Sequence, residues 1–246
     1  MPLKLKLLKY SIYLFIFFSL FILSTILYFL STLPDYSSLE DYRPKVMTRV
    51  HASNGHLVKE YSREYRIFIP IEDIPGDIKE AFISAEDKNF YNHYGVDPLG
   101  ILRASLYNIR NFIVNRRPQG ASTITQQVAK NFLLSDELSL SRKIKEALLS
   151  FKIEQILSKD RILELYLNQI YLGAGTYGIA AASNRYFEKE LANLTVPEAA
   201  YLAALPKAPS RYHPIKNYQL ALERRNWVLK RMFANEYISA KELERY

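Results

Sequence analysis

An uncharged apolar segment near the amino terminus constrains this chain more than any other feature. Residues 10–33 carry no charged side chain and consist mainly of Leu, Ile, Phe and Tyr. A helix of about 20 apolar residues is long enough to cross a bilayer. The alternative, a cleaved signal peptide, would have an apolar region of about 7–15 residues that ends in small residues. Because bulky Tyr28, Phe29 and Leu30 continue to the end of this segment, we predict an uncleaved transmembrane anchor.

The charges that flank the anchor predict its orientation. Lys4, Lys6 and Lys9 lie on the short tail that precedes it, residues 1–9. Lys and Arg on a short flank remain on the cytoplasmic side of a membrane. The tail is therefore expected in the cytoplasm, and the chain after the anchor is expected outside it.

The composition of the chain is that of one packed domain. A hydrophobic share of 49%, with 8 Gly and 11 Pro in 246 residues, excludes the disordered and low-complexity classes. The absence of Cys excludes disulfides and thiolate metal sites. The four His residues are not closely paired, so a zinc centre is not expected.

The excess of positive charge is concentrated rather than spread. The sequence has 33 Lys and Arg against 25 Asp and Glu, a formal net charge of +8. The interval between Asp97 and Asp136 contains no carboxylate, and five cations fall inside it: Arg103, Arg110, Arg116, Arg117 and Lys130. A field of one sign attracts anions such as lipid headgroups and phosphates, and a solvated basic face is the alternative. Nucleic acid is not an expected partner, because the domain lies outside the cytoplasm and its aromatic residues are not interleaved as a stacking platform requires.

The first part of the chain after the anchor has an extended pattern. Val46, Thr48 and Val50 alternate up to the turn dipeptide Asn54-Gly55, after which extended character resumes. This pattern predicts a short β-hairpin. A further extended run is expected over residues 65–71.

Helical periodicity begins after Pro75, where Ile78, Ala81, Phe82 and Ala85 share one face. It recurs in six later runs, at residues 99–114, 123–133, 139–157, 161–172, 197–205 and 219–233. Breaks are predicted at residues 117–120, 173–175 and 206–214. The predicted fold is mainly α, with a tail at 1–9, an anchor at 10–33, an extended linker and hairpin at 34–75, and a helical body at 76–246.

An acidic pair at the end of the first body helix is the first candidate site. Glu86 and Asp87 are followed by Phe90, His93 and Gly95, where the helix is expected to give way to a loop. A helix-end carboxylate among aromatic neighbours can have a pKa raised by desolvation, as a general acid or base near neutral pH requires. An exposed acidic pair beside a turn is the alternative.

Two further clusters have two interpretations each. Arg142 lies four residues and Lys143 three residues before Glu146, a spacing that fits a charged site or a surface salt bridge. In residues 120–127 a glycine turn leads Ser and Thr into a helix start. The free N–H groups there suit a phosphate, although helix capping is the commoner purpose of such residues.

The order and spacing of these clusters resemble glycosyltransferase family 51, the peptidoglycan glycosyltransferases. Five motifs of that family occur in order: Glu86-Asp87 with Phe90, His93 and Gly95; Gly120 to Gln127 with Lys130 and Asn131; Arg142, Lys143 and Glu146 with Ile153-Glu154; Ile162-Leu163-Glu164 with Tyr166-Leu167-Asn168 and Gly173; and Glu198-Ala199-Ala200 with Leu205 to Pro209. Ser150 stands where the family usually has Ala. The anchor and the hairpin also match the family's layout.

The resemblance implies a function and a location. A chain of this kind would polymerise lipid II into linear β-1,4-linked glycan strands, with inversion at the MurNAc anomeric carbon and release of undecaprenyl diphosphate. Its lysozyme-like helical domain would lie on the outer side of the bacterial cytoplasmic membrane. The implied partners are lipid II, the growing glycan chain, membrane lipids and other cell-wall synthesis proteins. No cofactor is required, and a divalent cation such as Mg²⁺ or Mn²⁺ near the phosphates is compatible with the reaction.

The resemblance also implies roles for individual residues. Glu86 would be the general base, and Glu146 the second essential acid. Lys130, Arg142 and Lys143 would hold the pyrophosphate. The other residues expected to bind substrate are Asp87, Phe90, His93, Ser122, Thr123, Gln127 and Asn131. No metal ligand is predicted.

Three other functions compete with this interpretation. A bifunctional penicillin-binding protein would add a transpeptidase with Ser-x-x-Lys and Lys-Thr-Gly motifs, and because this chain has neither, a monofunctional enzyme is expected. A glycoside hydrolase would use paired carboxylates and would not need the three pyrophosphate-binding cations. An inactive scaffold is disfavoured because Glu86 and Glu146 are both present.

Overall fold

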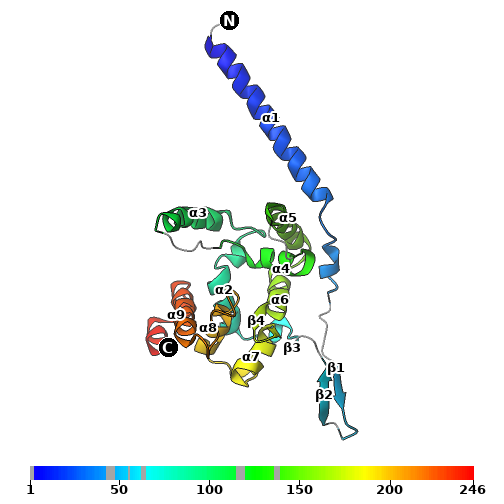
Figure 1. Cartoon of the computed structure of the whole chain (residues 1–246), viewed down its shortest axis with the longest axis vertical. Coiled ribbons are helices and arrows are strands. Elements are labelled where there is room, and N and C mark those ends of the chain that lie inside the picture. Colours follow the sequence, from blue (N-terminus) through cyan, green and yellow to red (C-terminus); the bar gives the residue numbers. More distant parts are fainter. Residues whose placement is uncertain (1–2, 43–47, 55, 62–64, 115–119, 136–138) are drawn as a thin grey trace.

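One long helix stands apart from a helical domain in the computed structural model (Figure 1). The structure describes residues 3–42, 48–54, 56–61, 65–114, 120–135 and 139–246. Helix α1 (Leu3–Ser31) contains a stretch, Lys9–Ser31, that is long and apolar enough to cross a membrane. None of that stretch is buried in the protein, as is required of side chains that face lipid. The predicted anchor therefore forms one continuous helix.

The anchor ends against the domain at helix α5 (Leu140–Ile156). Lys145 Nζ donates a hydrogen bond to the Thr32 carbonyl oxygen across 3.2 Å. A 3₁₀ turn, η1 (Ser37–Leu39), follows, and its Leu39 is buried in the domain core. In Figure 1, α3 (Pro98–Ile113) and α5 lie at the end of the domain nearest α1.

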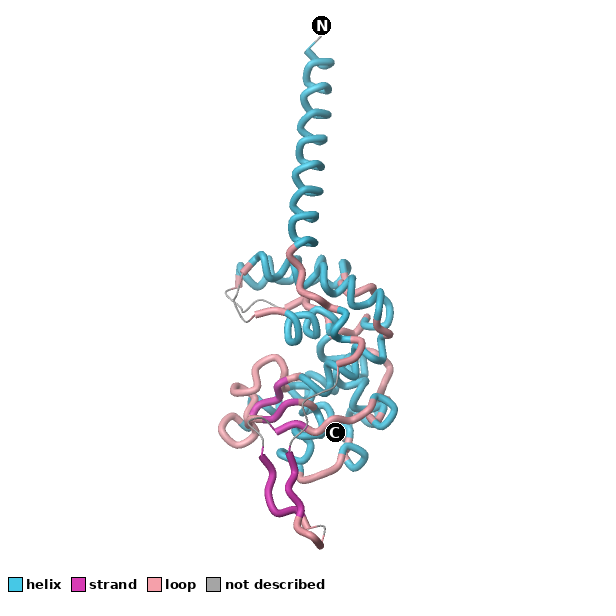
Figure 2. The backbone as a smooth tube through the Cα atoms, turned by 90° about the vertical axis from the view of Figure 1, so that its right-hand side faces the viewer, coloured by secondary structure: helices cyan, strands magenta, loops and turns pink. Residues whose placement is uncertain are grey.

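The strands form two small sheets. β1 (Thr48–His51) and β2 (Leu57–Tyr61) make an antiparallel hairpin, which confirms the short hairpin prediction. Val46 and Gly55, on which that prediction also rested, lie outside the described residues. In the second sheet, β5 (Thr176–Tyr177) lies between β3 (Tyr65–Arg66) and β4 (Tyr171–Gly173), parallel to the first and antiparallel to the second. Figure 2 shows the hairpin projecting at the end of the molecule opposite α1.

The body is mainly helical, as predicted. Besides α3 and α5, its helices are α2 (Gly76–Glu86), α4 (Ile124–Leu133), α6 (Lys159–Gln169), α7 (Ile179–Phe187), α8 (Val196–Ala204), α9 (Tyr218–Ala234) and α10 (Ala240–Arg245). Short 3₁₀ turns are η2 (Ile71–Asp73), η3 (Phe90–Asn92) and η4 (Leu191–Asn193). Side chains that accept from free backbone N–H groups cap the starts of five helices: Asp97, Thr123, Ser139, Ser158 and Ser239.

Two groups of helices enclose the core. α2 packs against α8 and α9, and α4 packs against α5 and α6. The two groups meet where Phe82 of α2 lies edge-on to Tyr166 of α6, with ring centroids 6.2 Å apart. Both side chains are buried, and of the α2 face that the periodicity predicted, Ile78 and Ala81 are also buried and Ala85 is partly buried. This packing holds the carboxyl end of α2, where Glu86 lies, in a fixed position.

The prediction of one helix over residues 161–172 was wrong at its end. The helix stops at Gln169, and Tyr171–Gly173 forms a strand instead. Gly173 and Gly175 have φ values of 89° and 75°, which glycine adopts readily, and they form a tight turn after this strand. β5 follows the turn and pairs with the strand. The turn lets Tyr171–Gly173 pair with β5, and β5 also pairs with the distant strand β3, so strand pairing overrides the local helical pattern here. Helix α7 was not predicted, and most of the predicted break at 117–120 lies outside the described residues.

Candidate active site

Glu86 is the last residue of α2, and its side chain lines a large cleft. The chain leaves the helix at Asp87, whose φ and ψ are −154° and 75°. Gln127 Nε2, from α4, donates a hydrogen bond to Glu86 Oε2 across 2.9 Å. Burial raises the pKa of Glu86, and the Gln127 hydrogen bond, Arg224 and Lys207 oppose that rise. A carboxylate with a raised pKa at the surface of a cleft can accept a proton from a bound substrate.

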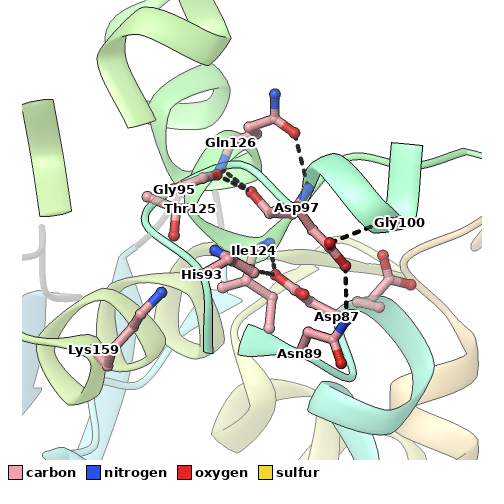
Figure 3. Close-up of polar contacts among 12 residues, drawn as sticks. Asp87, Asn89, His93, Gly95, Asp97, Gly100, Ile124, Thr125, Gln126 and Lys159 are labelled. Atoms are coloured by element: carbon pink, nitrogen blue, oxygen red, sulfur yellow. Dashed lines mark hydrogen bonds and ion pairs between the residues drawn. The ribbon is translucent and has the colours of Figure 1, made fainter. Parts of the chain in front are cut away.

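Asp87 is buried and makes polar contacts with the residues around it (Figure 3). Its Oδ2 lies 2.9 Å from His93 Nε2 and accepts from the backbone N–H of Ile124 across 3.0 Å. Phe90, between them in sequence, is fully buried. These contacts join the end of α2 to the start of α4, where the helix dipole favours a negative charge. Asp87, Phe90 and His93 therefore hold the motif together, and of the three only Asp87 also lines the cleft.

The start of α4 is fixed by a second set of contacts. Thr123 and Gln126 form a reciprocal capping box. Thr123 Oγ1 also donates to the Gly95 carbonyl oxygen across 2.6 Å. Gly95 has a φ of 87° and lies so close to the backbone of Ser150 that an added Cβ would be 2.6 Å from the Ser150 carbonyl carbon. The loop of the first motif is thereby held between α4 and α5.

The charged cluster of the third motif lies on α5, facing the same cleft. Glu146 is buried, with Lys143 Nζ 2.6 Å from its Oε2 and Arg142 Nε 3.2 Å from its Oε1. Lys143 Nζ also donates to Ser122 Oγ across 2.8 Å. The ion pairs of the salt-bridge interpretation are therefore present, and one buried carboxylate holds two cations at the surface of the cleft.

The cleft has a volume of about 1420 Å³ and is strongly basic. It is lined by ten Lys and Arg side chains but only four carboxylates. The cations are Lys88, Arg103, Arg110, Lys130, Arg142, Lys143, Lys207, Arg211, Arg224 and Arg231, and the carboxylates are Glu86, Asp87, Asp97 and Glu146. Of the predicted substrate-binding residues, Ser122, Thr123, Gln127 and Lys130 also line it, whereas Asn131 is exposed elsewhere and does not.

The sequence prediction missed one wall of this cleft. Arg224, Trp227 and Arg231 of α9 line it together with Lys207 and Arg211, from the loop that follows α8. The sequence did hold an indication of this wall. Arg224, Trp227 and Arg231 are separated by three and four residues, a spacing that places all three side chains on one face of a helix. That spacing does not reveal which neighbour the face meets, and the contact with the Glu86 region spans well over a hundred residues of sequence.

The carboxylates of the cleft do not form a metal-binding cluster. Within the described residues there is no group of three or more His, Asp or Glu side chains that could hold a metal ion. Glu146 and Asp87 are each occupied by partners within the protein.

Among the described residues, a partly buried carboxylate thus shares a cleft with many cations, in a helical domain attached to a helix that is long and apolar enough to cross a membrane. The chain belongs to the transglycosylase family, which its residues 54–233 match. This match confirms the resemblance to the peptidoglycan glycosyltransferases.

Several curated relatives are named penicillin-binding protein 1A. The one from Rickettsia bellii is 54% identical over 215 residues, which are 87% of this chain and 27% of the relative. The one from Aquifex aeolicus is 48% identical over 212 residues, 86% of this chain and 29% of the relative. This chain spans about a quarter of the length of such relatives. The crystal structure of penicillin-binding protein 1A from Haemophilus influenzae aligns with a TM-score of 0.46 and 27% identity, over 83% of this chain and 20% of that one.

Proposed function

We propose that this chain polymerises lipid II into linear β-1,4-linked glycan strands of peptidoglycan. One observation carries the proposal: Glu86, with a raised pKa, shares a cleft with Lys130 and with the cation pair that Glu146 holds. The reaction needs a base for an alcohol and positive charge for a leaving pyrophosphate, and the cleft offers both.

Glu86 is the proposed general base. Its carboxylate takes the proton from the 4-hydroxyl of the acceptor GlcNAc as that oxygen attacks the anomeric carbon of the donor MurNAc. The bond from that carbon to the phosphate oxygen breaks on the opposite side, which inverts the configuration. Gln127 holds the carboxylate through its 2.9 Å hydrogen bond and so fixes the direction in which the proton is accepted.

Lys130, Arg142 and Lys143 are the proposed ligands of the departing undecaprenyl diphosphate. Cations that are already in position stabilise the charge that grows on a leaving group more effectively than mobile water does. Glu146 keeps two of them at the cleft surface. Ser122 assists through its contact with Lys143.

The location of the cleft supports a membrane-bound substrate. α3 lies at the end of the domain nearest α1 (Figure 1) and carries a row of exposed apolar side chains: Leu99, Leu102, Leu106, Ile109 and Phe112. Leu106 of this row also lines the cleft, together with Arg103, Tyr107 and Arg110 of the same helix. We propose that the tail 1–9 is cytoplasmic, that the domain lies on the outer side of the bacterial cytoplasmic membrane, and that α3 contacts membrane lipids. Contacts with other cell-wall synthesis proteins belong to the same proposal.

We further propose that the enzyme needs no cofactor of its own. A divalent cation, Mg²⁺ or Mn²⁺, would act only as a companion of the substrate phosphates. Addition of a chelator is then expected to lower the rate without abolishing polymer.

The direct test is incubation of the purified chain with labelled lipid II, with polymer resolved on a gel. The proposal expects glycan polymer that the phosphoglycolipid inhibitor moenomycin abolishes. Intact, membrane-inserted protein that leaves lipid II unchanged, or that shortens preformed glycan, would refute it.

A further inference from the structure

The missed wall of the cleft is built around a single aromatic side chain. Trp227 lies on α9 between two arginines of the same helix face. The Arg224 Cζ atom is 3.8 Å from the ring centroid, and the Arg231 Cζ atom is 5.7 Å from it. The ring packs against the hydrophobic core on one side and lines the cleft on the other.

Neither arginine is held by a carboxylate. Among the described residues no Asp or Glu lies within ion-pair distance of either guanidinium group, and the Nε atoms of both are buried without a hydrogen-bond partner. Burial lowers the pKa of both groups, and Glu86 counteracts this for Arg224. The contact that the two guanidinium groups share is the face of the Trp227 ring.

A ring and a carboxylate support a guanidinium group in different ways. A carboxylate occupies two in-plane N–H donors and neutralises the charge. An aromatic face attracts the cation from above or below its plane and leaves those donors directed outward. Two arginines supported by one ring therefore keep both their charge and their hydrogen-bonding capacity for an anion in the cleft.

We propose that Trp227 is a positioning residue that holds Arg224 and Arg231 ready to bind a pyrophosphate group of the substrate. The inference rests on the proposed function for the identity of the natural ligand. It assigns no proton transfer to Trp227, which acts only through the two cations beside it.

The sequence provides its own probe for this contact. Trp227 is the only tryptophan in the chain, so tryptophan emission reports on this ring alone. The intact chain in detergent is titrated with inorganic pyrophosphate at constant ionic strength. The proposal expects a saturable change in emission, because the anion shifts the two guanidinium groups over the ring. Emission that does not respond, or that responds without saturating, would overturn it.

A pair of variants identifies the source of the signal. Arg224→Met with Arg231→Met should remove the saturable response, whereas Arg225→Met should retain it. Arg225 is a matched control because it is on the same helix, bonds to Asn226 and to the Tyr246 carbonyl oxygen, and does not line the cleft. A response that persists in the double variant would contradict the proposal.

Kinetics with lipid II test the positioning itself. Trp227→Leu should raise KM about tenfold, from the loss of two cation–π contacts, with a smaller change in kcat. Trp227→Phe keeps a weaker aromatic face and should recover part of that loss, and Phe233→Leu, on the same helix but away from the cleft, should leave KM unchanged. Equal KM values for the Leu and Phe variants would refute the role of the ring. If the chain does not polymerise lipid II at all, the proposed function fails, while the fluorescence titration still decides the case for Trp227.

Discussion

The Gln127 side chain donates to the Glu86 carboxylate across 2.9 Å and so links the carboxyl end of α2 to α4. Glu86 comes from the first motif and Gln127 from the second, and the packing of α2 and α4 into one core brings them together. The contact lies in the basic cleft where we propose that the reaction takes place.

This contact predicts how activity depends on pH. Burial raises the pKa of Glu86, whereas the Gln127 hydrogen bond lowers it. Gln127→Leu removes a lowering influence, so the pKa rises further. Since a general base must be ionised, the acid limb of the profile of kcat/KM against pH should move to higher pH. The matched control is Gln155→Leu, an exposed position of α5 outside the cleft. An acid limb that stays in place, or moves to lower pH, would contradict the assignment.

Lys130 is predicted to bind phosphate. Lys130→Ala should weaken the binding of moenomycin about tenfold to a hundredfold, the value of a hydrogen bond to a charged group. Binding is measured by titration of the detergent-solubilised chain. Lys241→Ala, on the exposed helix α10, should bind as the unchanged protein does. Equal affinities for the two variants would show that Lys130 makes no phosphate contact.

Gly95 is predicted to contribute to the stability of the fold rather than to the chemistry. In Gly95→Ala, the alanine would have to adopt a φ of 87°, which residues with a Cβ rarely do. Its Cβ would also lie 2.6 Å from the Ser150 backbone. The expected cost is about 3 kcal/mol, or a fall in melting temperature of about 6–12 °C. Circular dichroism of the two proteins during heating measures it. Gly76→Ala serves as the control, since the nearest atom to its added Cβ would be 3.9 Å away. The account of this loop is wrong if both variants melt at the same temperature.

Local patterns predicted the elements that local forces determine. Residues 10–33 indicated the anchor through length and composition alone, and Thr123 indicated a helix start through its capping chemistry. The cluster around Glu146 followed from helix spacing. Each of these rests on contacts within a few residues of sequence.

Features that depend on distant contacts could not be predicted in this way. The small sheet that ends the helix before Tyr171 includes β3, which lies about a hundred residues earlier in the sequence and pairs with β5. The wall formed by Arg224 and Trp227 meets Glu86 only because α9 packs against α2. The family motifs located the centre of the site, and the structure added the opposite wall of the cleft.

The central claim is that Glu86 is the general base. Glu86→Gln keeps the size of the side chain and removes its ability to accept a proton, so the decisive measurement is the rate at which this variant polymerises labelled lipid II. The account predicts a loss of at least about a hundredfold, with an unchanged melting curve and unchanged moenomycin binding. Polymer formed by the folded variant at the rate of the unchanged protein would contradict it.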